Sequence, residues 1–248
     1  MKKTIIVTGG TRGIGFAFAR RLALDGFQLA IVDVSGAEES AAALRADGFS
    51  AEGYQGDVTS EADWARITSA IDGGSAPLYG LVNNAALFAS LPVQPFHEIS
   101  KADWMQVMEV NTAGPFLGAK ACLPYFRKAG QGRIVNMAST SPLKGVTGMT
   151  HYVCSKGAVI SLTRSLAREL GELNITVNAV APGLTLSDGI LANTNHVDQF
   201  KGISRSARAL KRDALPEDLV GVVAFLMSQE AAFMTGQTLV VDGGAAFV

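Results

Sequence analysis

Short apolar runs and amphipathic stretches alternate along this chain from end to end. Apolar runs predict strands at 4–10, 28–33, 51–59, 78–86, 132–139, 175–183 and 236–244. Apolar positions spaced three and four apart predict helices at 13–26, 36–48, 60–72, 100–126, 151–173 and 216–228. Most strand runs are continuously apolar rather than alternating, so both faces of the sheet should be covered. The pattern therefore predicts an α/β fold built on a parallel sheet.

One segment interrupts this alternation. Residues 184–213 are polar and poorly periodic, and they connect the strand at 175–183 to the helix at 216–228. A connection of this length inside a compact domain is typical of a binding lid. We find no internal repeat and no low-complexity linker, so we expect residues 1–248 to form a single domain.

The composition narrows the range of partners. The chain has 248 residues, of which 48% are hydrophobic and 17% charged, as in globular proteins. A net charge of −1 argues against a nucleic-acid or anionic-membrane partner, and no apolar run is long enough to span a membrane. Cys122 and Cys154 lack metal-ligand spacing. We therefore expect no metal, a cytoplasmic location, and two buried free thiols.

The stretch "TGGTRGIG" lies between the first predicted strand and the first predicted helix, and it carries Gly9, Gly13 and Gly15. Glycines here allow a tight turn and a close approach of the backbone to a pyrophosphate, while the helix N-terminus offers free N–H groups. The spacing is G-x3-G-x-G rather than the commoner G-x-G-x-x-G, and such a loop alone can be only a tight turn. Its place between strand and helix favours a dinucleotide site.

Asp33 ends the second predicted strand, where a carboxylate would accept hydrogen bonds from the adenosine ribose and repel a 2′-phosphate. The alternative role is a cap for the helix that follows. Arg12, inside the glycine loop, would favour NADP, because a cation there could hold a 2′-phosphate. We give Asp33 more weight, and so predict NAD rather than NADP.

Tyr152 and Lys156 are four residues apart in the helix predicted at 151–173, so they share one face. Taken alone, they would be a surface pair worth about 0.2–0.5 kcal/mol. They do not stand alone, however. The motifs "TGGTRGIG", "GDV", "NNAA", "VNTAG", "GRIVNMAS", Tyr152-x3-Lys156, "APG" and "TGQTLVVDGG" occur in this order along the chain.

This ordered set resembles the short-chain dehydrogenases/reductases of the compact NAD(P)-dependent type, over essentially the whole chain. Each motif is weak singly, but the ordered set is specific. The resemblance implies a doubly wound Rossmann-type sheet of seven parallel strands in the order 3-2-1-4-5-6-7. It also implies a homotetramer assembled through the two long helices and the C-terminal edge.

The resemblance assigns further cofactor contacts by position. It places Asp57 and Val58 at the adenine, Asn84 on the ribose side, Pro182 and Gly183 beside the nicotinamide, and Ser187 at its carboxamide. Ile14, Thr185, Tyr152 and Lys156 complete the set. Two residues depart from the family pattern: Ala86 replaces a glycine, and His151 precedes the tyrosine. His151 either faces the substrate mouth or is an exposed residue at the helix start.

The catalytic residues implied by the resemblance are Ser139, Tyr152, Lys156 and Asn111. A free phenol has a pKa of about 10, too high for a base at neutral pH. The charge of Lys156 and that of the nicotinamide are expected to lower the pKa of Tyr152. Ser139 would hold the substrate oxygen against Tyr152.

Asn111 lies within a predicted helix, four residues before Pro115. Because proline has no N–H, the Asn111 carbonyl lacks its usual helical donor. We expect this carbonyl to bind a water that receives a proton relayed through Lys156. The alternative is that Pro115 only kinks the helix.

The substrate pocket is expected between residues 141–150 and the 184–213 lid, with walls from Ser141, Leu143, Val146, Met149 and Leu184. No arginine is clearly placed for a substrate carboxylate or phosphate. We therefore expect a small, largely uncharged secondary alcohol or ketone, aromatic or alicyclic. Five cations weaken this expectation: Lys144, Arg205, Arg208, Lys211 and Arg212.

Two other functions remain open. An NADP-dependent reductase of carrier-linked 3-oxoacyl chains would use the same scaffold, and the lid cations would suit an acidic carrier protein. An enoyl reductase is disfavoured, because that branch spaces tyrosine and lysine farther apart. A non-enzymatic NAD-binding sensor would be expected to lose Ser139, Tyr152 or Lys156, and all three are present.

Overall fold

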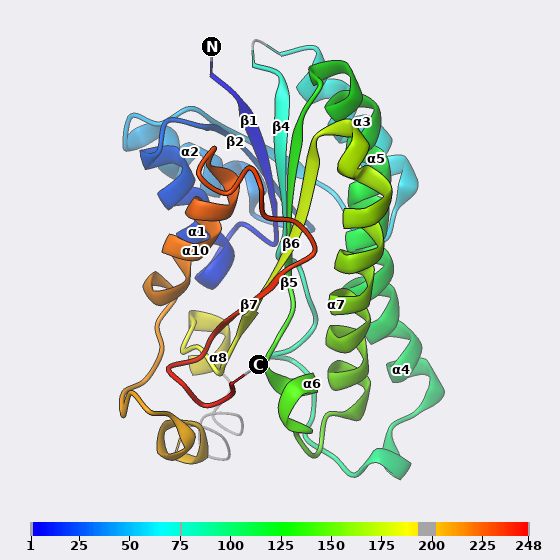
Figure 1. Ribbon diagram of the computed structural model, residues 1–248, viewed down its shortest axis with the longest axis vertical. Helices are drawn as coiled ribbons and strands as arrows, with labels where there is room; N and C mark the ends of the chain where they lie inside the picture. Colours follow the sequence, from blue (N-terminus) through cyan, green and yellow to red (C-terminus); the bar gives the residue numbers. More distant parts are fainter. Residues whose placement is uncertain (1, 75, 193–201, 248) are drawn as a thin grey trace.

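The computed structural model describes residues 2–74, 76–192 and 202–247, and it is built around one seven-stranded parallel sheet (Figure 1). The strand order is β3-β2-β1-β4-β5-β6-β7, which confirms the order implied by the sequence. The strands are β1 (Thr4–Thr8), β2 (Gln28–Asp33), β3 (Ala51–Gln55), β4 (Leu78–Asn83), β5 (Gly132–Met137), β6 (Ile175–Pro182) and β7 (Thr238–Val241). All pairings are parallel, as the continuously apolar strands predicted.

The middle of the sheet determines where a ligand can bind. Val7 of β1 pairs with Ile31 of β2 on one side and with Val82 of β4 on the other. The chain leaves β1 toward β2 and later returns to β4, so the order of strands reverses between β1 and β4. A crevice opens at the carboxyl ends of the strands at such a reversal.

Helices cover the two faces of the sheet (Figure 1). One face carries α1 (Gly13–Leu24), α2 (Ala37–Ala46) and α10 (Glu217–Met227). The other carries α3 (Glu61–Asp72), α5 (Gly114–Ala129) and α7 (Thr150–Leu170). Ser60 caps α3 by accepting a hydrogen bond from the Asp63 N–H.

The helix predicted at 100–126 is not continuous. It consists of α4 (Lys101–Met108), a π-helical turn at Glu109–Ala113, and α5. Pro115 lies just inside the start of α5 and has no N–H for the carbonyl one turn earlier, so the regular pattern cannot run through this point. The sequence correctly predicted that helical hydrogen bonding is disturbed near Pro115, but it did not predict a π-helical turn.

Shorter elements surround the carboxyl ends of the strands. These are a 3-10 helix at Phe96–Glu98, α6 (Ser141–Lys144) and α8 (Asp188–Leu191), and residues 202–207 are also helical. A further 3-10 helix, Gly171–Leu173, follows α7. The predicted lid, 184–213, therefore includes α8 and the helical residues 202–207, while its residues 193–201 lie outside the described part of the chain.

The two cysteines differ, which corrects the expectation that both are buried. Cys122 belongs to α5 and is buried, and burial raises the pKa of its thiol. Cys154 is exposed on α7, because it lies on the side of that helix away from the sheet. No helix in the described ranges combines the length and apolar character that crossing a membrane requires.

Candidate functional site

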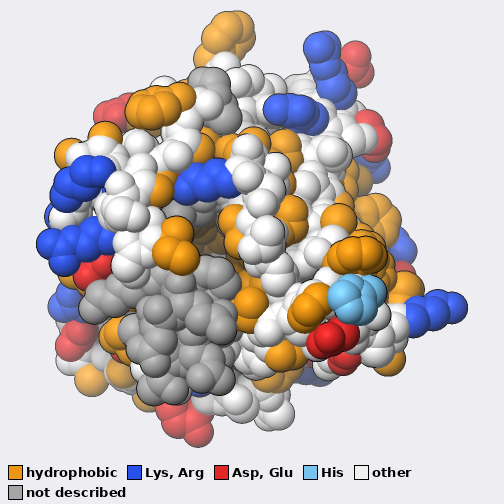
Figure 2. All heavy atoms as spheres, turned by 90° about the horizontal axis from the view of Figure 1, so that it is seen from below, with side chains coloured by type: hydrophobic (Ala, Val, Ile, Leu, Met, Phe, Trp, Pro, Cys, Tyr) orange, Lys and Arg blue, Asp and Glu red, His pale blue; other side chains and the backbone are white. Residues whose placement is uncertain are grey.

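A cavity of about 820 Å³ opens at the carboxyl ends of the strands. Seen from that end, the surface is hollowed, and hydrophobic side chains show inside the hollow (Figure 2). Every residue that the sequence assigned to the cofactor lines this cavity, and so do Ser139, Ser141, Val146, Met149 and Leu184. One space therefore joins the glycine loop to the proposed catalytic residues.

The glycine loop is too tightly packed for side chains. A Cβ on Gly15 would lie 2.0 Å from the Gly9 carbonyl oxygen, and one on Gly9 would lie 2.8 Å from Ala85 Cα. Gly9 and Gly13 also have positive φ angles of 62° and 54°. The backbone itself therefore forms the cavity wall here, as a diphosphate requires.

The amino end of α1 points into the same region. Its N-cap residue, Arg12, makes no side-chain cap, and its first turn contains no acidic residue. The N–H groups of that turn are left for an anion, and the helix dipole favours negative charge there. The glycine loop and α1 together fit a dinucleotide's diphosphate.

Asn84 supports the loop from beneath. Its side-chain Nδ2 donates to the Thr8 carbonyl at 3.0 Å and to the Gly9 carbonyl at 2.9 Å. The Thr8 hydroxyl in turn accepts hydrogen bonds from the N–H groups of Asn84 and Ala85. Asn84 thus lines the cavity and also fixes the position of the first glycine.

Asp33 is held in place at the end of β2. The Thr11 hydroxyl donates to Asp33 Oδ2 at 2.7 Å, and the Val34 N–H donates to Oδ1 at 2.8 Å. Both oxygens accept, as an ionised carboxylate does. Arg12 is exposed at the same end of the cavity. The carboxylate that favours NAD and the cation that would favour NADP are therefore both present at this end.

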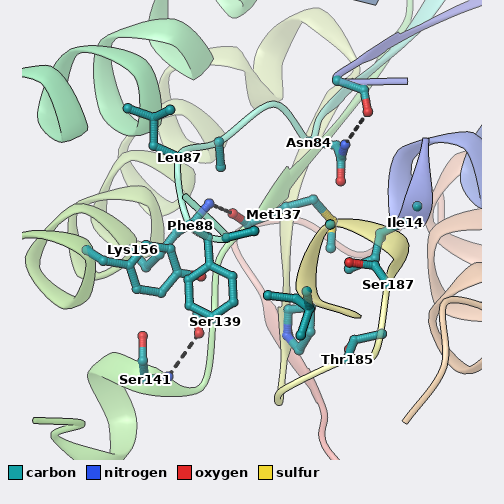
Figure 3. Close-up of a pocket in the computed structure, with 18 of the residues that line it drawn as sticks. Ile14, Asn84, Leu87, Phe88, Met137, Ser139, Ser141, Lys156, Thr185 and Ser187 are labelled. Carbon is teal, nitrogen blue, oxygen red and sulfur yellow. Dashed lines mark hydrogen bonds between the residues drawn. The ribbon is translucent and has the colours of Figure 1, made fainter. Parts of the chain in front are cut away.

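Tyr152, Ser139 and Lys156 meet at the opposite end. Figure 3 shows Ser139, Phe88 and Lys156 on one side of the cavity, facing Ile14 and Ser187 on the other. Lys156 Nζ donates to the Met137 carbonyl at 2.7 Å and lies 5.9 Å from the centre of the Tyr152 ring. The Tyr152 side chain hydrogen-bonds Ser139. A substrate oxygen can therefore contact two hydroxyl groups at once.

The pKa of Tyr152 departs from expectation. Burial raises it to about 12, and the hydrogen bond with Ser139 acts in the opposite direction. Burial also lowers the pKa of Lys156 to about 8. The expected lowering of the phenol's pKa by Lys156 is therefore not found, and desolvation disfavours the charged forms of both groups.

This burial gives Lys156 a testable effect on stability. An ammonium whose pKa falls from 10.5 to about 8 on folding binds its proton more tightly in the unfolded chain, so stability rises with pH between those values. We expect Lys156→Met to be about 1–2 kcal/mol more stable than the unmodified protein at pH 7, after the lost hydrogen bond is allowed for. Urea unfolding at pH 7 and pH 9.5 measures this, and a gap that does not narrow at pH 9.5 contradicts it.

Asn111 lies beneath the cavity rather than on its wall, and it is fully buried. Its side-chain Oδ1 accepts from the Leu87 N–H at 2.7 Å, and its Nδ2 donates to the Leu87 carbonyl and to Ser155 Oγ, each at 3.1 Å. Ser155 donates to the Tyr152 carbonyl at 2.8 Å. The amide therefore joins the loop after β4 to the turn of α7 that carries Tyr152.

That loop places Phe88 against Tyr152, with ring centres 4.7 Å apart and a 35° tilt. Leu91, Val107 and Met149 bury the same tyrosine in a small apolar cluster. This packing accounts for much of the desolvation of the phenol. The sequence did not identify Phe88, because an isolated aromatic in a loop has no periodic partner.

Two sequence-based expectations for the substrate wall are wrong. Leu143 is 41% exposed and lies outside the cavity lining, because it sits on the outer side of the short helix α6. His151 is neither at the cavity mouth nor exposed at the helix start. It is fully buried, and neither ring nitrogen has a hydrogen-bond partner.

Comparisons with known proteins identify the family of this chain. Residues 9–246 match a family model described as enoyl-(acyl carrier protein) reductase. The chain is 36% identical to 2-(S)-hydroxypropyl-CoM dehydrogenase 3 of Xanthobacter autotrophicus, over 98% of this chain and 96% of the relative. It is also 36% identical to cyclopentanol dehydrogenase of Comamonas, with the same coverage.

A solved structure shows the same architecture. It is a candidate NAD(P)-dependent gluconate 5-dehydrogenase from Beutenbergia cavernae with bound NADP, 32% identical, with a TM-score of 0.89. The alignment covers 98% of this chain and 96% of that one. The protein is thus an NAD(P)-dependent dehydrogenase acting on CH–OH groups, and it belongs to the short-chain dehydrogenase/reductase family.

Proposed function

We propose that this protein transfers a hydride between NAD and a small secondary alcohol or ketone, with Tyr152 as the acid/base. The observation that carries the proposal is the single cavity that joins the glycine loop and Asp33 to Ser139, Tyr152 and Lys156. The alternative of a non-enzymatic NAD-binding sensor is not favoured, because Ser139, Tyr152 and Lys156 all line this cavity.

In the proposed mechanism, the substrate oxygen sits between the hydroxyls of Ser139 and Tyr152. Ser139 positions the oxygen, and Tyr152 takes the alcohol proton during oxidation or donates it to a carbonyl during reduction. A bound nicotinamide dinucleotide supplies the hydride acceptor and, when oxidised, a positive charge beside the phenol. Burial raises the pKa of Tyr152 to about 12, which favours the protonated phenol that donates to a carbonyl during reduction.

We assign the proton path beyond Tyr152 to Lys156 and Asn111. The Lys156 ammonium is buried, so a proton leaving it needs an acceptor inside the protein. Pro115 cannot donate to the Asn111 carbonyl, which leaves that oxygen available for a water. The water would complete the relay that the sequence suggested.

The cavity wall supports a compact apolar group on the substrate. Phe88, Val146, Met149 and Leu184 line the substrate end. The relatives named for cyclopentanol and for 2-(S)-hydroxypropyl-CoM act, by their names, on secondary alcohols. An alicyclic or aromatic secondary alcohol is the substrate body that we propose.

An absorbance screen of candidate substrates tests the proposed function directly. Secondary alcohols, including alicyclic and aromatic ones, are incubated with NAD or NADP, and reduced cofactor is followed at 340 nm. We expect turnover with NAD and secondary alcohols. Turnover confined to carrier-linked 3-oxoacyl chains with NADPH would favour the alternative reductase.

The lid cations give that alternative little support. Arg212 pairs with Asp218 at 2.6 Å, Lys211 Nζ donates to the Ser206 carbonyl, and Arg205 Nε donates to the Lys211 carbonyl. Lys211 and Arg205 are engaged within their own segment, and Arg212 is engaged with the first turn of α10. They are therefore less available to an acidic carrier protein than the sequence alone suggested.

Cofactor preference gives a separate prediction. In Asp33→Ala, the carboxylate that would bind the ribose is lost, and its repulsion of a 2′-phosphate is lost as well. We expect kcat/KM for NAD to fall about tenfold or more, on the scale of a charged hydrogen bond, and kcat/KM for NADP to rise. Arg12→Ala is the matched control and should lower only the NADP value. A preference for NADP in the unmodified protein would contradict the assignment.

We also propose the homotetramer that the resemblance implies. Met105 and Phe116, on the α4–α5 side, are 54% and 45% exposed, while Phe233 and Phe247 near the C-terminal edge are largely exposed. Exposed aromatic and apolar side chains of this size are typical of subunit interfaces. Light scattering that gives the mass of a single chain would contradict the proposal.

A further inference from the structure

At the substrate end of the cavity, the short helix α6 contributes a charged side chain to the wall, that of Lys144. Ser141 and Lys144 lie three residues apart on this short helix, and both line the cavity. The Ser141 N–H donates to Ser139 Oγ at 3.1 Å, so α6 starts beside the position of the reacting oxygen (Figure 3). Lys144 follows one turn later, about 5 Å farther along the helix axis.

Lys144 is paired with a carboxylate that lies behind the wall. Its Nζ is 3.4 Å from Asp242 Oδ2, and the side chains of the two residues are 30% and 1% exposed. Asp242 Oδ1 already accepts from the N–H groups of Gly244 and Ala245, which fixes the carboxylate. Asp242 Oδ2 makes no hydrogen bond, so Lys144 is held by charge while its donors remain uncommitted. The cavity therefore faces the ammonium and not the carboxylate.

Arg208 lies near the same part of the wall. A Cβ placed on Gly183 would lie 2.9 Å from Asp242 Cβ and 3.6 Å from Arg208 Nη2, so both side chains border Gly183. Arg208 is 3% exposed and donates to the Leu184 carbonyl on the cavity wall. Arg208 thus fixes the backbone beside Asp242 but does not itself line the cavity, so Lys144 is the cation that faces it.

Ser141 adds an uncommitted polar group. Its hydroxyl is buried and has no hydrogen-bond partner. Buried polar groups are normally paired, so an unpaired hydroxyl beside an ammonium needs an explanation. Phe88 and Met149, which line the same cavity, contribute apolar surface beside these polar groups.

We propose that Lys144, with Ser141 beside it, binds an anionic group of the substrate, a carboxylate being the simplest. This inference rests on the proposed function and refines it. The substrate body lies against Phe88, and one end carries a negative charge. The reacting carbon and the anionic group are separated by the few bonds that one helical turn spans.

Matched substrates test this subsite. The series 3-hydroxybutanoate, 4-hydroxypentanoate and 5-hydroxyhexanoate is compared with the corresponding neutral amides, in the presence of saturating NAD. For the best chain length, we expect kcat/KM to be about tenfold higher for the acid than for the amide. The ratio should fall to about one in Lys144→Met and should be largely retained in Lys144→Arg.

Lys120→Met is the matched control, because Lys120 forms an exposed ion pair with Glu61 at 3.2 Å and neither residue lines the cavity. Its acid-to-amide ratio should equal that of the unmodified protein. If Lys144→Met fails to fold because Asp242 is left unpaired, the double variant Lys144→Met with Asp242→Asn removes both charges and gives the same test. Dissociation constants of the matching keto acid and keto amide, measured by calorimetry with oxidised dinucleotide so that no turnover occurs, should show the same ratio.

Two results separate this inference from the proposed function. If the unmodified protein oxidises 2-pentanol but treats acid and amide alike, or if Lys144→Met leaves the ratio unchanged, the anionic subsite is wrong and the proposed function stands. If neither charged nor neutral secondary alcohols are oxidised, the proposed function itself is wrong.

Discussion

Tyr152→Phe should reduce turnover of any secondary alcohol by at least about a hundredfold, the usual scale for a lost acid–base group. The substitution removes one oxygen and keeps the ring, so the contact with Phe88 and the apolar cluster around the phenol should persist. The glycine loop lies at the other end of the cavity and is not altered. Dinucleotide affinity should therefore stay within about twofold of the unmodified value, which separates a chemical defect from a binding defect.

Stopped-flow kinetics and fluorescence titration of the reduced cofactor measure the two effects. Tyr125→Phe is the matched control, because Tyr125 is a half-buried tyrosine of α5 that packs against the apolar core around Trp64 and Phe126, away from the Tyr152 cluster. It should leave turnover unchanged. If Tyr152→Phe retains most of its activity, the proton passes through another group and the proposed mechanism is wrong.

The fold was predictable because its determinants are periodic. β1, β4 and β5 are buried along their whole length, so their apolar runs stand out in the sequence. The glycine loop was also predictable, because only glycine fits beside the Gly9 carbonyl and at positive φ. In these places a local sequence pattern and a three-dimensional requirement coincide.

The substrate wall was less predictable, for a different reason. The sequence correctly placed Ser141 on the wall. However, α6 has only four residues, too few for an apolar period, so the sequence could not say that Lys144 faces the cavity while Leu143 faces outward. Phe88 meets Tyr152 only because Asn111 fixes the neighbouring Leu87 backbone across 24 residues of chain. The counter-charge of Lys144 comes from Asp242, almost a hundred residues later. Such contacts depend on tertiary packing and leave no local signal.

The desolvation of Tyr152 and Lys156 was also beyond the sequence. Their spacing of four residues indicated a shared face, but the direction of the pKa shift depends on burial by Phe88, Leu91 and Met149. Burial thus favours the protonated phenol at this position. We predict that the positive charge of an oxidised nicotinamide would favour the phenolate and so assist oxidation.

The second large effect is expected at the glycine loop. In Gly15→Ala, the new Cβ would lie 2.0 Å from the Gly9 carbonyl oxygen and 2.5 Å from Asn84 Nδ2. No side-chain rotation can relieve a contact with backbone, so the loop must shift, at a cost of about 1–3 kcal/mol. The shifted carbonyl also loses its hydrogen bond from Asn84, which now holds the loop at 2.9 Å.

We expect Gly15→Ala to weaken dinucleotide binding about tenfold to a hundredfold, since the backbone that cradles the diphosphate is displaced. Calorimetry with NAD measures the affinity, and circular dichroism establishes that the variant is folded. Gly221→Ala is the matched control, because Gly221 lies within α10 and a Cβ there meets nothing within 4 Å. That substitution should leave affinity unchanged and raise stability slightly, because alanine favours helix more than glycine does. A folded Gly15→Ala protein that binds NAD as tightly as the unmodified chain would show that the loop does not hold the diphosphate, and the assignment of the whole cavity would fail with it.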